Sequence, residues 1–362
     1  MLFRKKTYTS SSSLSVQAWK RFRHDRLGFG SLIFIGIVLL IALLGYLITP
    51  DPTPFANDQC LEMGLKKPGF HAEFILVPKD PPVKQKGLLH RMIWGEKSRY
   101  NAYPVIDGTV DIYDQKGVYL RESAEVYLQE HPEATLIGRT YWLGTDRFGR
   151  DLLSMLVIGA RISLSVGFIS VVISLVLGLL IGSIGGYFRG WVDHVIVWFI
   201  NVVWSIPTLL LVIAITFALG KGFWQVFIAV GLTMWVEVAR VVRGQILSLR
   251  EKEFVEAGKA LGFSSFRIIT RHLLPNVMGI VIVISAANFA SAILIEAGLS
   301  FLGMGVQPPV PSWGSMIKEN YGYIVLDYAY LAIIPGIAIM LLVLAFMLIG
   351  NALRDALDVK SV

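Results

Sequence analysis

The sequence predicts an all-α membrane protein with six transmembrane helices, and three observations support this fold class. Of its 362 residues, 54% are hydrophobic and only 16% are charged. The mean hydropathy is +0.61, well above that of a typical soluble domain. Apolar stretches of the roughly 20 residues needed to cross a bilayer recur along the chain, with charged segments between them.

The N-terminal residues 1–27 are expected to form a cytoplasmic amphipathic segment. Basic residues outnumber acidic ones there, and by the positive-inside rule such an end remains in the cytoplasm. Trp19 and Phe22 predict a short interfacial helix whose aromatic side chains face lipid. Residues 28–49 then form the first transmembrane helix. It is too long for a signal peptide, so we expect it to remain as an anchor.

A polar segment of roughly 90 residues, 50–140, follows the first transmembrane helix. Because one crossing precedes it, we expect it on the extracytoplasmic side. The stretches PVIDG, TVDIYD and GVYLRE predict short strands, with a turn at Asp107-Gly108, and SAEVYLQEHPEA predicts a short helix. We therefore expect an α+β insertion between the first and second transmembrane helices; the alternative is a loop without a fixed fold.

Residues 141–352 are expected to form the core, with the other five transmembrane helices and a charged loop at 237–276. Gly178, Gly182 and Gly186 recur at a spacing of four, which favours close helix packing. Residues 353–362 form a cytoplasmic tail, so both termini lie in the cytoplasm. The five expected helices cover residues 162–184, 195–219 with a kink at Pro207, 223–238, 277–303 and 328–350.

The loop at 237–276 is too charged to lie in lipid, because each Arg, Lys or acid costs about 2.5–3.5 kcal/mol at a bilayer centre. Its sequence predicts two short helices broken at Gly262. Ser264 is a candidate N-cap for the second helix, and Pro275 is expected to end it. The result is an amphipathic hairpin, Glu253–Asn276, on the membrane surface.

Within this hairpin, Glu-Ala-Gly is followed after three residues by Gly262, and nine residues later by His-Leu-Leu-Pro. This order resembles the EAA loop in the membrane subunits of bacterial ABC importers. The resemblance implies the type I ABC importer permease fold and a coupling helix that docks on a cytoplasmic ATPase. Two positions depart from the common pattern, Gly258 for Ala and His272 for Ile. The expected coupling residues are Glu256, Ala257, Gly258, Gly262, Phe263, Phe266, Arg267, Arg271, His272 and Pro275.

Two other stretches resemble the dipeptide and oligopeptide branch of that family. They are LGTDRFGRD with the following GARISL, and EAGLSFLGMGVQPPVPSWG from Glu296 to Gly314. The resemblance implies import of short peptides delivered by an extracytoplasmic substrate-binding protein. It also implies a heterodimer with a second homologous permease, and two ATPase subunits that bind ATP and Mg. Relatives carry nickel, opines, glutathione or oligosaccharides, so these substrates stay open.

A candidate translocation path rests on Glu296, because acids inside membrane helices are costly and usually face a bundle interior or an aqueous cavity. Glu296 either lines or braces the path near its outer gate, or makes a structural hydrogen bond to a neighbouring helix. Asn288, Asn201 and Trp204 are the other candidates for the path.

Several function classes find no support in the sequence. It contains no GxxxxGK[ST], GxSxG or HExxH, so we expect no ATP hydrolysis or hydrolase activity in this chain. With the single Cys60, we expect no disulfide, metal or cofactor. The net charge of +7 lies mainly at the ends of apolar segments, so no nucleic-acid partner is expected. The alternatives are a membrane enzyme using Asp146, Asp151 and Glu296, or a receptor. For the pair Asp146 and Asp151, a capping and interfacial role is favoured over catalysis, with Thr145 or Asp146 as the candidate helix cap.

Overall fold

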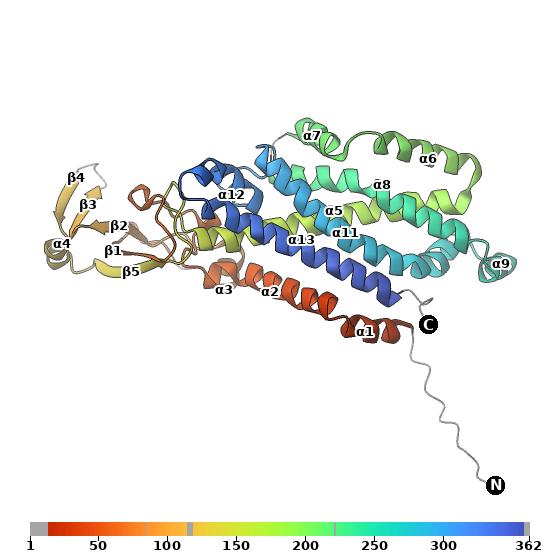
Figure 1. The fold of residues 1–362 in the computed structure, drawn as a ribbon, viewed down its shortest axis with the longest axis horizontal. Helices are drawn as coiled ribbons and strands as arrows, with labels where there is room; N and C mark the ends of the chain where they lie inside the picture. The colour runs from red at the N-terminus through yellow and green to blue at the C-terminus, as the bar shows by residue number, and fades with distance from the viewer. Residues whose placement is uncertain (1–13, 85, 114–118, 221, 358–362) are drawn as a thin grey trace, which may run out of the picture.

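The computed structural model describes residues 14–84, 86–113, 119–220 and 222–357. They form an elongated bundle of long helices with a small β-sheet at one end (Figure 1). The first thirteen and last five residues, which belong to the expected terminal segments, lie outside the described residues.

Five helices in the described part of the chain are long and apolar enough to cross a membrane. A sixth span results if the bent pair α6 (Gly190–Trp204) and α7 (Thr208–Leu219) counts as one. The structure thus agrees with a mostly helical membrane fold of five to six spans. The five are α2 (Arg26–Ile48), α5 (Leu152–Phe188), α8 (Phe223–Leu249), α11 (Leu274–Phe301) and α13 (Tyr330–Leu357).

The expected third transmembrane helix is wrong as a single kinked helix, because α6 and α7 meet at 91°. The break lies at residues 205–207. Pro207 has extended backbone angles, φ −54° and ψ 125°, and its ring disfavours helical geometry at the preceding Ile206. Pro207 therefore separates two helices instead of bending one.

Helices α5 and α8 form the most extensive helix pair, and small residues make their close approach possible. A β-carbon on Gly182 would lie 2.5 Å from the carbonyl oxygen of Ala239, and one on Gly178 would lie 2.4 Å from the β-carbon of Val238. The predicted role of the glycine repeat is confirmed. Both helices extend well beyond the length needed to span the bilayer.

Helix α1 (Leu14–His24) begins the described chain and packs on the far end of the bundle. Asp25 caps the following α2 by accepting hydrogen bonds from the amides of Leu27 and Gly28, at 3.0 and 3.2 Å. Trp19 is exposed, but Phe22 is buried against Ala352 of α13. The expectation that both aromatic side chains of this helix face lipid is therefore wrong for Phe22.

Residues 70–141 contain a five-stranded antiparallel sheet in the order β4-β3-β2-β1-β5. Three strands coincide with predicted ones, and the turn at Asp107-Gly108 joins β2 to β3 with positive φ at both residues, as predicted. Strands β1 and β5 were not predicted from the sequence. The bounds are β1 Phe70–Pro78, β2 Tyr100–Ile106, β3 Thr109–Tyr113, β4 Tyr119–Ser123 and β5 Thr135–Tyr141.

Short helices fill the connections. The sheet region also holds α3 (Leu88–Trp94), which lies beside the end of α2, and α4 (Ala124–Glu130), which packs on the sheet. Elsewhere are α9 (Glu253–Ala260), α10 (Ser265–Ile268) and α12 (Trp313–Asn320), a π-helical turn at Ile269–Leu273, and 3-10 turns at Pro54–Ala56, Leu61–Met63 and Tyr321–Val325.

Candidate functional site

The hairpin at 253–276 projects from the end of the bundle opposite the sheet (Figure 1). Helix α9 ends in a Schellman turn: the amide of Gly262 donates to the carbonyl of Lys259 at 2.9 Å, and that of Phe263 to the carbonyl of Gly258 at 3.0 Å. Gly262 has φ +75°, and a β-carbon there would meet no neighbour within 4 Å. Glycine is favoured at this position by backbone conformation and not by space.

The second arm of the hairpin does not end at Pro275, which corrects the sequence expectation. Ser264 caps α10 as predicted, accepting from the amide of Arg267 at 3.4 Å. The helix then continues through the π-helical turn into α11, so Ser265–Phe301 is one helical run. The amide of Leu274 donates to the carbonyl of Ile269, five residues back. This wider turn accommodates Pro275, which has no amide hydrogen to donate.

One face of the hairpin is fixed to the bundle by a hydrophobic cluster. Val255 of α9 and Ile268 and Leu273 of the second arm are essentially fully buried there. Their partners come from α5, α8 and α11, and are Tyr187, Val238, Val242, Ile246, Val277 and Val281. The hairpin is therefore a packed extension of three long helices and not a separate loop.

Phe263 belongs to this inner side, although the sequence resemblance placed it among the residues expected to couple to an ATPase. Its ring stacks on that of His272 with centroids 5.7 Å apart, and the guanidinium of Arg267 lies over it at 4.1 Å. A β-carbon at Gly258 would lie 3.3 Å from the same ring. Of the coupling residues expected from the sequence, Phe263, Gly258 and His272 therefore support the turn from within.

The hairpin also exposes apolar side chains. Leu261 and Phe266 are 72% and 77% exposed, and Phe254 is also exposed. Phe254, Ala257 and Leu261 follow a spacing of three and four, which puts them on one side of α9. We call Phe254, Ala257, Leu261 and Phe266 the outer face. Sequence reasoning missed Phe254 and Leu261, although their helical spacing with Ala257 was visible.

The hairpin also carries exposed charged side chains. Glu256 and Arg271 are exposed, and within the described residues neither has a salt-bridge partner. Exposed apolar side chains together with unpaired charges are typical of a protein-binding surface.

Ion pairs near the base of the hairpin fix the neighbouring helix ends. Arg243 of α8 binds the Asp193 carboxylate of α6 through two nitrogens, each at 2.5 Å. Arg189, at the turn between α5 and α6, pairs with Glu251 beside α9, and this hydrogen bond lowers the pKa of Glu251. These pairs join α8 to α6, and the segment just before the hairpin to the turn between α5 and α6.

The four residues predicted for a translocation path do not share one surface in this chain. Glu296 is fully buried in α11, where its Oε1 accepts from the Ser300 hydroxyl at 2.7 Å. Asn288 is also buried, while Asn201 and Trp204 are exposed on α6. The Arg240 guanidinium lies 3.1 Å from the centroid of the Trp204 ring. Glu296 therefore does not line an open surface of this chain.

A second polar cluster, the LGTD joint (residues 143–151), connects the sheet to the helices. The Thr145 hydroxyl donates to the Met63 carbonyl at 2.5 Å and accepts from the Lys66 amide at 2.8 Å. The Asp146 carboxylate accepts from two amides of its own loop and from Arg150. Arg150 also reaches Glu319 of α12 at 2.6 Å. Burial lowers the pKa of Arg150, but the two carboxylates outweigh it and the pKa is raised.

Asp151 begins α5 as its N-cap, accepting from the amide and hydroxyl of Ser154 at 2.8 and 2.5 Å. The cap is thus Asp151, not Thr145 or Asp146 as expected. Since the oxygens of Asp146 are occupied by donors from its own loop, the arrangement fits a structural role better than catalysis.

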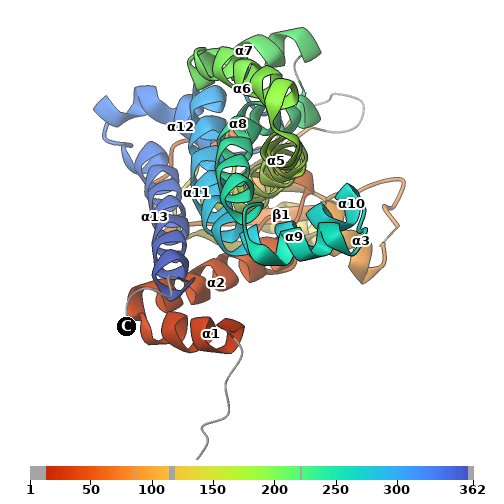
Figure 2. The same ribbon diagram turned by 90° about the vertical axis from the view of Figure 1, so that its right-hand side faces the viewer.

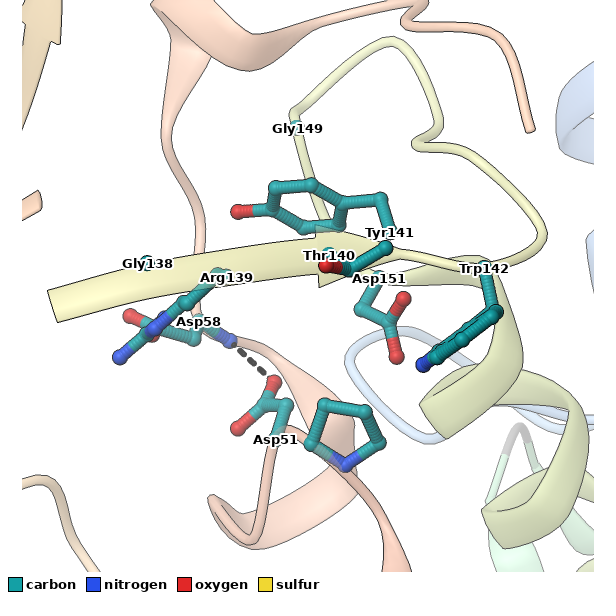
Figure 3. A pocket seen from close by; sticks show the side chains of 10 residues that line it. Asp51, Asp58, Gly138, Arg139, Thr140, Tyr141, Trp142, Gly149 and Asp151 are labelled. Carbon is teal, nitrogen blue, oxygen red and sulfur yellow. Dashed lines mark hydrogen bonds and ion pairs between the residues drawn. The ribbon is translucent and has the colours of Figure 1, made fainter. Parts of the chain in front are cut away.

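A cavity of ≈ 290 Å³ lies between β5 and the segment after α2 (Figure 3). Arg139 of β5 pairs with Asp58 at 3.0 Å, and Asp51 accepts from the amides of Thr53 and Asp58. Burial raises the pKa of Asp51. No group of His, Cys, Asp and Glu in the described residues could hold a metal ion. We assign this cluster to the connection between the sheet and the bundle.

The long apolar helices, the bent pair and the projecting hairpin define a multi-pass membrane protein of the permease type. The family described as "Binding-protein-dependent transport system inner membrane component" matches residues 174–360. The family described as "N-terminal TM domain of oligopeptide transport permease C" matches residues 13–68. The chain belongs to the binding-protein-dependent transport system inner membrane components, in their oligopeptide and dipeptide permease branch.

Two curated relatives, a dipeptide and a glutathione permease, agree with this assignment. The dipeptide transport system permease protein DppC of Alkalihalophilus pseudofirmus is 41% identical over 236 residues, which cover 65% of this chain and 77% of the relative. The glutathione transport system permease protein GsiD of Pectobacterium atrosepticum is 39% identical over 220 residues, covering 61% and 73%. A chain of the inward-facing methionine ABC transporter MetNI superposes with a TM-score of 0.48 at 19% identity, covering 57% of this chain and 97% of that chain.

Proposed function

We propose that this chain is the permease subunit of an importer that moves short peptides across the cytoplasmic membrane. ATP hydrolysis takes place in two separate ATPase subunits, which bind the ATP and Mg that this chain does not bind itself. The observation that carries the proposal is the two-sided hairpin. Its inner side is packed on α5, α8 and α11, and its outer face exposes Leu261 and Phe266 to a partner.

The proposed orientation has both termini and the hairpin in the cytoplasm, with residues 50–140 as an extracytoplasmic α+β insertion. Two features support it. Helix α1, the described end of α13 and the hairpin lie at one end of the bundle, with the sheet at the other (Figure 1). Basic side chains also gather near the first end, as the positive-inside rule requires of a cytoplasmic end. They are Arg21, Arg23, Arg26, Arg243, Arg250 and Arg354.

The proposed assembly contains a second, homologous permease, two ATPases and an extracytoplasmic substrate-binding protein, all in a lipid bilayer. In this assembly the outer face of the hairpin docks in a groove of one ATPase. The path for peptides then lies between the two permeases. Trp204 and Asn201 are exposed toward the surroundings of this chain and remain candidates for its lining, whereas Glu296 braces α11 from inside.

Short peptides are the proposed substrate because the DppC relative is named for dipeptides. Glutathione is the second candidate. The GsiD relative, which is named for glutathione, is 39% identical to this chain, close to the 41% of the DppC relative. Purified transporter in proteoliposomes, supplied with ATP and the substrate-binding protein, would take up a labelled dipeptide. Uptake of glutathione but not of dipeptide would replace the first substrate with the second, and a lack of any ATP-dependent uptake would overturn the proposal.

A further inference from the structure

Helix α3 in the sheet region exposes an apolar surface that no part of the described chain covers. Leu88 and Leu89 are 66% and 69% exposed, and Ile93 and Trp94 are also exposed. Leu89 and Ile93 are four residues apart and share one side of the helix. A large tryptophan and three aliphatic side chains within seven residues require a partner or an apolar surrounding.

The position of α3 is fixed at the end of the membrane-spanning helices. The Arg161 guanidinium of α5 donates to the Met92 carbonyl at 2.9 Å and lies 5.0 Å from the centroid of the Tyr46 ring of α2. The Glu96 amide donates to the Pro52 carbonyl at 2.9 Å. Because Tyr46 is in the last turn of α2, α3 lies level with the membrane boundary of that helix.

The exposed side chains of α3 lie close to a surface that faces lipid. Leu43, Leu47 and Ile48 in the last turns of α2 are exposed, and α2 and α3 are in contact. In the view along the bundle, α3 lies at its periphery and not between the long helices (Figure 2). An interfacial location agrees with Trp94, since tryptophan is enriched at membrane–water boundaries.

The charges around α3 are those of a membrane-surface helix. Lys84, Lys86, His90 and Arg91 precede or lie within it, and no acid occurs between residues 84 and 94. Lys86 approaches the His90 ring at 3.1 Å, and Arg91 is paired with Glu96 at 2.8 Å. Lys84 and Lys86 are exposed. Lysine is depleted in protein interfaces but attracts anionic lipid headgroups.

We propose that α3 is a membrane foot: Leu88, Leu89, Ile93 and Trp94 insert into the headgroup–acyl boundary of the leaflet nearest the sheet, and the flanking lysines contact anionic headgroups. The foot holds the sheet region at a fixed height and tilt on the bilayer. This inference requires only that α2 spans the membrane, and it holds for either orientation of the chain and any substrate.

Site-directed spin labelling tests the foot directly. In a Cys60→Ser background, a label at Leu89→Cys is compared with labels at Leu120→Cys on β4 and Leu40→Cys on α2, both exposed in the structure. The full chain is reconstituted in vesicles of phosphatidylethanolamine and phosphatidylglycerol. Collisions with oxygen and with a water-soluble nickel chelate then report the depth of each label.

The label at residue 89 should favour oxygen over the nickel chelate, with a depth between that of residue 40 and that of residue 120. Its depth should decrease when phosphatidylcholine replaces the anionic lipid. Nickel accessibility at residue 89 equal to that at residue 120 would overturn the proposal, because α3 would then face water. Low accessibility to both reagents would also overturn it, because protein, such as a second copy of the chain, would then cover α3.

Discussion

Arg150 and Glu319 lie 169 residues apart in the chain, yet their side chains form an ion pair of 2.6 Å that joins the LGTD joint to α12. The same guanidinium pairs with Asp146, whose side chain is 1% exposed. Substitution Arg150→Met should lower the free energy of unfolding by about 3 kcal/mol, because it leaves a buried carboxylate without its cation. Thermal unfolding of the purified chain in detergent measures this loss.

The exposed pair Arg121–Asp111 in the sheet provides the control. Substitution Arg121→Met should cost less than about 1 kcal/mol, because solvent screens an exposed ion pair. Equal destabilisation by the two substitutions would mean that Arg150 does not act through its buried carboxylates.

Phe263 and Phe266 are three residues apart but should respond differently to substitution by alanine. Phe263 packs in the hydrophobic cluster at the base of the hairpin, so Phe263→Ala should reduce stability by about 2 kcal/mol. Phe266 is largely exposed, so Phe266→Ala should leave thermal unfolding unchanged and reduce copurification of the ATPase. If Phe266→Ala retains full ATPase binding, the outer face is not the docking surface.

The two phenylalanines illustrate which features of the hairpin can be predicted from the sequence and which cannot. The break at Gly262 was predictable, since a left-handed turn is a local backbone property that the glycine itself signals. The inward rotation of Phe263 was not, because it depends on Gly258, His272 and Arg267 meeting in three dimensions. The continuation of the helix past Pro275 depends on a π-helical turn that no residue pattern in the sequence predicts.

Replacement of Glu296 by glutamine, which keeps the side-chain shape, should be tolerated better than truncation to alanine. Its carboxylate is fully buried and accepts from Ser300, whose hydroxyl lies 3.3 Å from that of Ser312. Glu296→Gln keeps an acceptor there and should transport near the wild-type rate, whereas Glu296→Ala leaves the Ser300 hydroxyl without its acceptor and should cost about 1–3 kcal/mol of stability. Peptide uptake and unfolding measured on both variants test this. Normal stability of Glu296→Ala with lost transport would instead restore a role in the path.

The sheet region can be shortened without disturbing the joint. Replacing residues 100–134 by a flexible linker of about six residues removes β2, β3, β4 and α4, but keeps Met63 and Lys66, which hold Thr145. Such a variant should insert normally, because its spanning helices are unchanged, and should lose substrate-binding-protein docking or uptake. Unchanged docking and uptake would show that the removed strands and α4 have no role in transport.

The limits of sequence analysis are similar at the other sites. Apolar length was sufficient to find α2, α5, α8, α11 and α13, because crossing a bilayer requires it. The 91° turn after Trp204 was missed, since Pro207 is compatible with a kink as well as a break. Strands β1 and β5 pair residues that are 59 to 71 positions apart, from Leu76 opposite Thr135 to Phe70 opposite Tyr141, and such pairing has no local signal.

Transport-coupled ATP hydrolysis by the reconstituted transporter tests the central claim, that the hairpin transmits ATP-driven motion into the membrane. Two variants at Gly262 are compared with the wild type. Gly262→Val cannot readily adopt the observed φ of +75°, whereas Gly262→Asn can, and an added β-carbon meets no neighbour in either. Hydrolysis stimulated by loaded substrate-binding protein should remain near the wild-type rate in Gly262→Asn. In Gly262→Val it should be lost or become independent of the binding protein, with normal membrane insertion. Wild-type uptake and normally stimulated hydrolysis in Gly262→Val would contradict the coupling role of the hairpin.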